Sequence, residues 1–490
     1  MAAGGEIAVD ENVFLCPVLQ GCAIFPYLRT MFNPPGMKEE SYAGACHNTR
    51  GWRRIWLLGL LLLVVSLTEF VVRGPVRFAL AGDFNDFKSP YIQTRAWMKG
   101  IDPYSPANLV ALWPDTGQRL DFLKRDMADG TLVLKHGIPT AYPPTSFVLL
   151  APIAWLPYRL AHPTWLLISL FACVLTVVSL AFRARLHWPE KRSYLFLAFA
   201  FALAPFHTGL GAGSLVIVAV AACALAVWAI DRQQDLTAGI LIGVAVGLKP
   251  QIGLPFLVYY LLRRRWRVVG VAVTLVALLA AIAILHLSLH HTPWIDNYRN
   301  DNKVLFARGS LGDFTEENPI RFGLINLQVL LYTFIPDRTA ATFVALVMSG
   351  AMGVLWLLLL RRRDGNDTEL LELSALCLLS LLPVYHRLYD ASLLIFPLAW
   401  SMTALSGPLK KWAKGTLFLM LVFLVPGGSA LEQLQYSNHF HRLQHSWWWL
   451  HFALPHQVWT LFLLTALLLY AMRISTSPSE NLDQNVRFRG

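Results

Sequence analysis

Two aspartates, Asp83 and Asp86, lie close together in the segment AGDFNDFKSP, residues 81–90, immediately after an apolar run. Charged residues make up only 14% of the chain, so this placement needs a reason. A carboxylate that is partly removed from water can act as a general base and take a proton from an attacking hydroxyl group. The alternatives are solvated aspartates without a role and a metal pair, although no His or further acid is spaced with them as metal ligands usually are.

Lys249 is the second candidate, in the segment GLKPQIGLPF, residues 247–256. It lies between two short apolar segments, and Pro250 directly after it must interrupt the helix. We therefore expect Lys249 at the outward-facing tip of a helical hairpin. A lysine in such a place costs a few kcal/mol unless it is paired or hydrated. It is either a snorkelling or salt-bridged lysine or a cation that binds a phosphate.

Four side chains cluster in a third segment, PVYHRLYDASLL, residues 383–394: His386, Arg387, Tyr389 and Asp390. A guanidinium group offers forked donors to phosphate oxygens, so Arg387 beside His386 would make an anion clamp that Asp390 orients. The alternative is that these residues only cap helices at a short turn.

Two further segments have a structural and a functional interpretation. The glycine-rich HTGLGAGS, residues 207–214, contains Gly211 and either permits close packing or presents backbone NH groups to an anion. The segment HFHRLQHSWWWLHF, residues 439–452, is typical of an aromatic belt at a membrane boundary, with sugar stacking as the alternative.

These segments are separated by helices that the composition places in a bilayer. Hydrophobic residues make up 56% of the 490 residues, and the mean hydropathy is +0.49. We expect an all-α polytopic membrane protein with about twelve crossings. Long apolar runs lie at residues 55–72, 164–182, 214–230, 267–289, 340–360 and 457–472, and shorter ones at 194–206, 237–248, 251–262, 369–384, 391–405 and 415–425.

Basic residues indicate the orientation of these crossings. The net charge of +11 is concentrated between apolar runs, and placing the N-terminus inside puts every basic cluster on the cytoplasmic side. The charge therefore indicates topology and not a nucleic-acid partner. We expect cytoplasmic tails at 1–50 and 474–490 around a membrane domain at 51–473. Its outward loops are expected at 74–145, 207–213, 290–338, 385–390 and 426–456.

The first outward loop has recognisable local structure. Ser89 and Pro90 suit the start of a helix and Gly100 its end, so we expect about ten helical residues on the membrane surface. Residues 145–156 are too short and too proline-bounded to span, and we expect a re-entrant or interfacial segment. The first 50 residues carry no basic start followed by an apolar core, so the first span is expected to act as signal anchor. The six cysteines form no CxxC pair and predict neither disulfides nor zinc.

The acidic and cationic motifs thus map to one face of the membrane. Anion-binding groups beside a candidate base and a lipid phase suggest a lipid-linked phosphate substrate. A lipid-linked saccharide transporter or flippase would also need outward cations, but it should carry polar groups through the cytoplasmic half as well. The inner halves of these helices are expected to be apolar, which favours an enzyme.

The ordered motifs resemble glycosyltransferase family 87. They are NDFKSPYIQTRAWMKGIDPY, then YPP, a glycine-rich turn, LKPQ and HRLYD, between about residues 55 and 400. Counting from Asp86, and not from Asp83, reproduces the family's spacing to Gly100, Asp102, Pro103 and Tyr104. One departure is visible: where family members often have Gly-Gln-x-Asn, this chain has Gly211 to Ser214 without amide side chains.

The resemblance implies a GT-C fold and an inverting transfer of a hexose, mannose-like, from a polyprenyl-phosphate sugar donor to a lipid or glycan acceptor. It implies Asp86 as catalytic base. Lys249, Arg387 and His386 would bind the donor phosphate, and Asp83, Tyr104, Tyr142, Tyr389, Asp390 and Gly211 would support or bind substrate. No metal or other cofactor is required. The enzyme would lie in the plasma membrane with its site on the exoplasmic face. A glycan polymerase or ligase using undecaprenyl-diphosphate substrates would share this donor chemistry and face.

Overall fold

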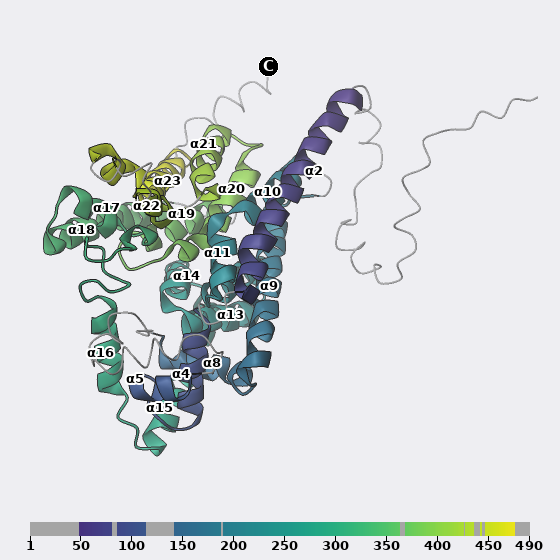
Figure 1. Ribbon diagram of the computed structural model, residues 1–490. Helices are drawn as coiled ribbons and strands as arrows, with labels where there is room; N and C mark the ends of the chain where they lie inside the picture. Colours follow the sequence, from purple (N-terminus) through teal and green to yellow (C-terminus); the bar gives the residue numbers. More distant parts are fainter. Residues whose placement is uncertain are drawn as a thin grey trace, which may run out of the picture.

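The computed structural model describes residues 49–80, 86–113, 142–187, 190–362, 368–425, 427–435, 442 and 446–475 (Figure 1). These residues form helices and connecting turns without a β-strand. The two predicted tails lie outside the described residues except for residues 49–50 and 474–475, as do Asp83 and residues 439–441 and 443–445 of the segment 439–452.

Five helices are long and apolar enough to cross a membrane, which agrees with a polytopic membrane protein. They are Leu57–Leu80, Tyr158–Arg183 (α9), Trp266–Leu289 (α15), Arg338–Arg361 (α18) and His456–Ile474 (α23). Helices α10 (Lys191–Ala202) and α11 (Ala204–Ala212), bent by 44° at their junction, would make a sixth. Shorter apolar helices are α8 (Pro144–Ala154), α12 (Val216–Asp231), α13 (Asp235–Leu248) and α14 (Pro250–Leu262). The number of crossings, about twelve, stays a prediction.

The first crossing is longer than the sequence pattern indicated. Helix α2 (Thr49–Val71) continues through a π-helical turn, Val72–Val76, into α3 (Arg77–Leu80). Pro75 lies inside that turn and lacks an N–H donor, and the wider turn accommodates it without ending the helix. The helix therefore continues to Leu80, beyond the predicted loop start at residue 74.

The glycine-rich segment is helical, whereas a turn over 207–213 was predicted. The glycines of α11 lie where neighbouring elements approach closely: a Cβ at Gly211 would be 2.5 Å from the carbonyl oxygen of Arg73. Gly213 ends the helix with φ of +69°, a conformation that glycine adopts without strain. Tertiary packing thus overrides the low helix propensity of glycine.

The helix predicted after Asp86 is present as α4 (Lys88–Met98). It begins one residue before Ser89, and Gly100 follows its end with φ of +68°. Most of its side chains are buried, chiefly against α8, which is more burial than a helix lying on a membrane surface would have. Figure 1 shows α4, α5 (Pro106–Ala111), α8 and α16 (Ile295–Leu305) gathered near one end of α15.

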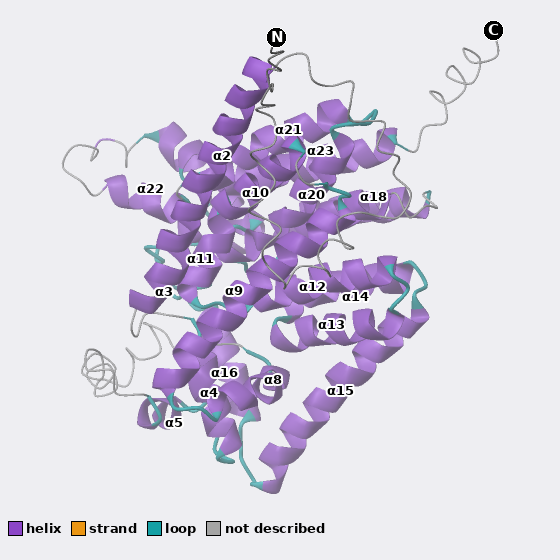
Figure 2. Cartoon of the chain, turned by 90° about the vertical axis from the view of Figure 1, so that its right-hand side faces the viewer, coloured by secondary structure: helices purple, strands orange, loops and turns teal. Residues whose placement is uncertain are grey.

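Helices α12, α13, α14 and α15 form the layered part of the bundle (Figure 2). Two glycines of α13 let it pack closely on α15, since a Cβ at Gly239 would lie 2.6 Å from the Val271 Cβ and one at Gly243 2.9 Å from Leu275 Cδ2. Small residues at a helix–helix contact are the usual way in which helices associate in lipid. Lys249 lies at the junction of α13 and α14, at the end of this packed pair.

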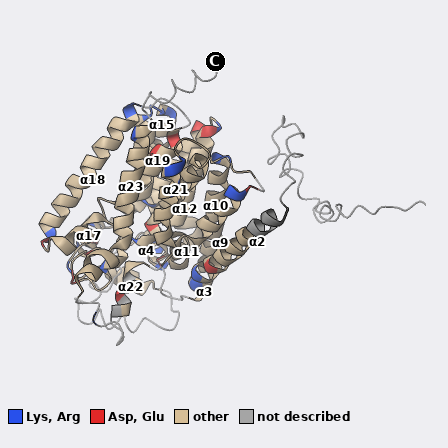
Figure 3. Cartoon of the chain, turned by 90° about the horizontal axis from the view of Figure 1, so that it is seen from above, with Lys and Arg blue, Asp and Glu red and all other residues tan. Residues whose placement is uncertain are grey.

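The remaining helices complete the bundle and its loops. They are α17 (Leu327–Phe334), α19 (Glu369–Leu381), α20 (Ile395–Ala404), α21 (Lys410–Met420), α22 (Gly428–Gln435), the 3₁₀ helices Arg321–Gly323, Leu388–Leu394 and Leu421–Leu424, and a π-helix, Trp449–Ala453. Most of the helical surface is uncharged, and Lys, Arg, Asp and Glu gather at helix ends (Figure 3).

Candidate active site

The segment around residue 387 is held by its own backbone. Leu324 and Arg387 form an isolated antiparallel bridge, and the Ile325 N–H donates to the His386 carbonyl at 3.0 Å. The Arg387 N–H donates to the Asp390 carboxylate at 3.0 Å and so caps the 3₁₀ helix that follows. This capping fixes the orientation of the side chains in the turn.

Lys249 forms an ion pair with Asp390. The side chains are 7% and 1% exposed, so both charges lie in the interior. Lys249 Nζ also lies 4.8 Å from the centre of the Tyr389 ring. Burial alone would raise the pKa of Asp390, but the charges of Lys249 and His386 hold it below its usual value. The salt-bridged alternative for this lysine is therefore what the structure contains.

His386 completes this buried group. Its Nδ1 lies 3.1 Å from Asp390 Oδ2, and its Nε2 has no hydrogen-bond partner among the described residues. With Nδ1–H donating to the carboxylate, Nε2 is left as the second polar atom of the ring. Lys249, Asp390 and His386 thus form an inner layer of the site, and we refer to them as the inner triad.

The Asp86 backbone contacts the C-terminal end of the glycine-rich helix α11, where the Asp86 N–H donates to the Ala212 carbonyl at 2.6 Å. Its side chain is half-buried, and Oδ2 is buried without a hydrogen-bond partner among the described residues. A carboxylate oxygen left without a donor is poised to accept a proton or a hydroxyl group. This is the arrangement that a general base requires.

The Arg387 guanidinium lies within the electrostatic reach of Asp86. Burial would lower the pKa of Arg387, but Tyr385, Tyr389 and Asp86 raise it. Arg387 Nε donates to the Tyr385 hydroxyl at 3.0 Å, which fixes the plane of the guanidinium. Asp86 and Arg387 are thus near enough for their charges to interact.

Tyr142 joins the same group. Burial raises the pKa of its hydroxyl well above the ordinary value, and Asp86 and Asp390 raise it further. The phenol therefore stays protonated and can donate a hydrogen bond. Asp86, Tyr142, Tyr385, Arg387 and Tyr389 are all half-buried, in contrast to the inner triad, so they form the accessible layer of the site.

The Gly100–Tyr104 motif acts on the site through Tyr142. Asp102 accepts a hydrogen bond from the Tyr104 N–H at 2.8 Å, and the buried Tyr104 hydroxyl donates to the Tyr142 carbonyl at 2.8 Å. Tyr104 thereby positions the backbone of Tyr142 and lies one contact away from the accessible layer. Gly211 faces the π-helical turn, so its visible role is packing.

A comparison with known proteins supports this reading of the sequence. The family model for glycosyltransferase family 87 matches residues 140–384, which is half of the chain. The chain belongs to glycosyltransferase family 87. The resemblance seen in the sequence is thus confirmed, and the protein is a membrane glycosyltransferase. Neither a search of curated proteins nor one of solved structures finds a match.

The family-87 match covers only part of the candidate site. Tyr142, Gly211 and Lys249 fall inside residues 140–384, whereas Asp86, Tyr104 and the segment from 385 to 390 fall outside. Asp86, Tyr104 and the segment from 385 to 390 nevertheless contact residues inside the matched range through the hydrogen bonds and the ion pair described above. A membrane glycosyltransferase needs a sugar donor and an acceptor.

Sequence reasoning missed several polar residues of this family-87 protein. Tyr385 lies in the segment that had been singled out, but its bond to Arg387 depends on the extended backbone there. Asn297 donates to Asp102, and nearby Asp301 is buried. Burial, and secondarily the charge of Asp102, raises the pKa of Asp301 to about 7. The sequence feature that could have identified Asn297 and Asp301 is the polar run IDNYRNDN in α16, which lies within a predicted outward loop.

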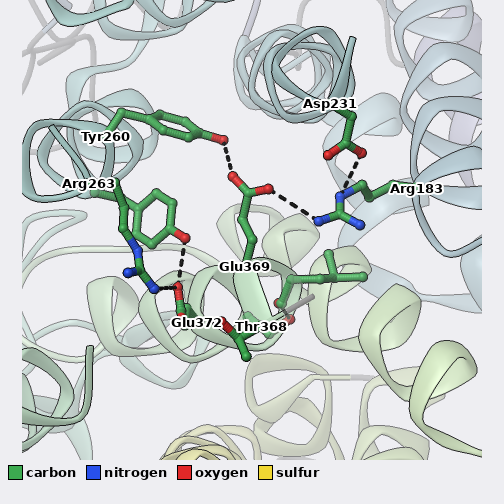
Figure 4. A network of polar contacts seen from close by, with 10 residues as sticks. Arg183, Asp231, Tyr260, Arg263, Thr368, Glu369 and Glu372 are labelled. Carbon is green, nitrogen blue, oxygen red and sulfur yellow. Dashed lines mark hydrogen bonds and ion pairs between the residues drawn. The ribbon is translucent and has the colours of Figure 1, made fainter. Parts of the chain in front are cut away.

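A second polar network includes Arg183 and Arg263, two members of the basic clusters that were predicted to be cytoplasmic, and Figure 4 shows its contacts. Arg183 lies 2.8 Å from Asp231 and 3.2 Å from Glu369, and the Tyr260 hydroxyl donates to Glu369 at 3.1 Å. Beside it, Glu372 pairs with Arg263 and accepts hydrogen bonds from further hydroxyl groups, those of Tyr259 and Thr368.

This network corrects one expectation. The inner halves of the helices are not uniformly apolar, because α9, α12, α14 and α19 each contribute polar groups to it. The carboxylates are paired, which is the condition under which charges are tolerated in the interior. The expected apolar inner half therefore does not separate an enzyme from a transporter.

Proposed function

We propose that the protein is an inverting hexosyltransferase of the GT-C type that uses a polyprenyl-phosphate sugar, mannose-like, as donor. The acceptor is a lipid or glycan on the exoplasmic face of the plasma membrane, and both termini are cytoplasmic. The observation that carries this proposal is the Asp86 carboxylate, which has an oxygen lacking a hydrogen-bond donor among the described residues and lies within electrostatic reach of the Arg387 guanidinium.

Asp86 is the base in this mechanism. The acceptor hydroxyl gives its proton to Asp86 as its oxygen forms a bond to the anomeric carbon of the donor. The bond between that carbon and the phosphate oxygen breaks from the opposite side, and the electron pair leaves with the polyprenyl phosphate. A single displacement of this kind inverts the anomeric configuration.

Arg387 is the group that we assign to direct phosphate contact. It is half-buried in the accessible layer, and its forked donors match phosphate oxygens. The negative charge on the phosphate grows as the sugar leaves, so a fixed cation is worth most in the transition state. Lys249 and His386 belong to the inner triad and act on the phosphate less directly: Lys249 adds positive charge near it, and Asp390 orients both side chains.

Tyr142 and the two prolines after it shape the acceptor side. Its protonated hydroxyl can donate to an acceptor oxygen, and Pro143 and Pro144 open helix α8 with fixed backbone angles. Tyr104 keeps this segment in place through the Tyr142 carbonyl. In this assignment Tyr389 packs on Lys249, and Gly211 contributes through packing.

The decisive experiment incubates the purified protein with a radiolabelled polyprenyl-phosphate mannose and a membrane extract as acceptor source. The proposal expects free polyprenyl phosphate and a labelled, glycosylated product with inverted configuration. Release of label only as water-soluble mannose, or use of an undecaprenyl-diphosphate glycan in place of the monophosphate donor, would refute it.

The transporter alternative is tested in the same preparation. Reconstituted vesicles with labelled lipid-linked sugar in one leaflet measure its movement, and movement without any glycosylated product would favour a flippase.

A further inference from the structure

Two adjoining hollows lie at the end of α13 and α15 remote from Lys249. One is a polar cavity of about 310 Å³ lined by Ile230, Asp231, Gln233, Asp235, Arg265, Arg267 and Glu369. The other is an open groove of about 1070 Å³ along the two helices, lined mainly by α13 residues 235–237 and α15 residues 267–278. The distance along the axis of α13 from its first residue, Asp235, to Lys249 just after its end is ~21 Å. The hollows are therefore separate from the candidate active site.

The groove has the shape and surface of a hydrocarbon site. Leu236 and Leu278 on its walls are more than half exposed, and the path from Arg267 to Leu278 along α15 is ~16 Å long, close to that of a fatty acyl chain. Gly270 forms part of the floor of the groove and leaves it open, because nothing lies within 4 Å of a Cβ placed there. A bilayer supplies acyl chains to any groove of this kind on a membrane-spanning helix.

The polar cavity is charged in a specific pattern. Arg183 pairs with both Asp231 and Glu369, so these two carboxylates are compensated. Asp235 differs, because its Oδ1 is buried without a hydrogen-bond partner among the described residues. Arg265 and Arg267 are exposed and make no ion pair within the part of the chain that the structure describes. The cavity thus offers guanidinium groups and one under-satisfied carboxylate.

We propose that the two hollows form one binding site for a membrane phospholipid whose headgroup carries both a phosphate and a primary ammonium group. Gln233, Asp235 and Arg267 line both hollows, so one molecule can fill both. The arginines bind the phosphate, Asp235 binds the ammonium group, and an acyl chain lies along Gly270. The site does not depend on the proposed reaction, since it lies at the other end of α13.

The test is native mass spectrometry of the delipidated protein with three phospholipids of identical acyl chains. Phosphatidylethanolamine should bind about tenfold more tightly than the other two. Phosphatidylcholine keeps the positive charge but has no N–H donor for Asp235, and phosphatidylglycerol has no cation. Asp235→Asn should abolish this preference, and Arg267→Gln should weaken binding of all three. Equal binding of the three lipids to the unmodified protein would overturn the headgroup assignment.

The groove is tested by filling it. Gly270→Leu should lower lipid binding about tenfold, because the acyl chain loses its contact with the floor. Gly350→Leu on α18 is the matched control, since nothing lies within 4 Å of a Cβ there either. Thr274→Phe fills the same groove from another position and serves if Gly270→Leu lowers the yield of folded protein. Unchanged lipid binding by the folded groove variants, or an equal loss in Gly350→Leu, would overturn the site.

Discussion

Lys249 and Asp390, separated by 141 residues in the chain, form an ion pair in the protein interior. The pair joins the α13–α14 hairpin to the turn that carries Arg387. A mutation of either partner leaves the other charge buried and alone, which costs more than the pair itself contributes. A functional test of Lys249 must therefore distinguish a loss of stability from a loss of donor binding.

Lys249→Ala should lower the free energy of unfolding by about 3–5 kcal/mol and weaken donor binding at the same time. The double variant Lys249→Met with Asp390→Asn removes both charges, and we expect it to regain most of the thermal stability. If the double variant also regains donor affinity, measured by titration with the polyprenyl-phosphate sugar, Lys249 has no part in phosphate binding.

Asp86→Asn should keep its fold and lose transfer by a factor of about 10² to 10⁴, the usual contribution of a general base. The amide has nearly the same shape as the carboxylate but cannot take the proton. Asp296→Asn is the control, because that carboxylate is almost fully exposed on α16. Transfer rates of purified variants, with melting temperatures alongside, make the comparison. A fully active Asp86→Asn would remove this residue from the mechanism.

Arg387→Lys keeps the positive charge but loses the forked donors and the bond to the Tyr385 hydroxyl. We expect donor affinity to fall about ten- to a hundredfold, as for the loss of hydrogen bonds to a charged group. Arg308→Lys, at an exposed surface pair, should leave it unchanged. Equal affinity of Arg387→Lys and the unmodified protein would place the donor phosphate elsewhere.

Gly211→Ala separates the two interpretations of the glycine-rich helix. An added Cβ would lie 2.5 Å from the Arg73 carbonyl oxygen, so we expect a fall in melting temperature and in folded yield. Gly353→Ala on α18, whose Cβ would meet nothing closer than 3.8 Å, should be neutral or slightly stabilising. An unchanged melting temperature together with weaker donor binding would support anion binding at Gly211 instead.

Asp301 gives a pH dependence with a definite sign. The folded protein raises its pKa from 3.8 to about 7, so between these values the folded state binds a proton that the unfolded chain has released. Stability from this group therefore falls as the pH rises from about 4 to about 7 and is level above that. Asp301→Asn should flatten this part of the profile of melting temperature against pH. A profile identical to that of the unmodified protein would contradict it.

Local patterns predicted the parts of this structure that depend on neighbouring residues. The helix after Asp86, the interruption at Pro250 and the turn at Arg387 follow from short-range rules for proline, glycine and charged residues. The convergence of the acid and the cations was predicted from topology, and their mutual influence is present.

Long-range pairing could not be read from the sequence. Arg183 and Glu369 are 186 residues apart, and nothing local to either one indicates the other. The helical form of HTGLGA has the same origin, since each glycine there is explained by what packs against it. The division of the site into a buried triad and an accessible layer likewise depends on tertiary packing.

The hydrogen bond between the Tyr104 hydroxyl and the Tyr142 carbonyl closes a stretch of 38 residues. Asp102 holds the Tyr104 backbone, and the Tyr142 side chain lies within electrostatic reach of Asp86. The entropy of closing such a stretch grows only slowly with its length. We therefore expect the position of Tyr142 to depend on these two anchors more than on the exact number of residues between them.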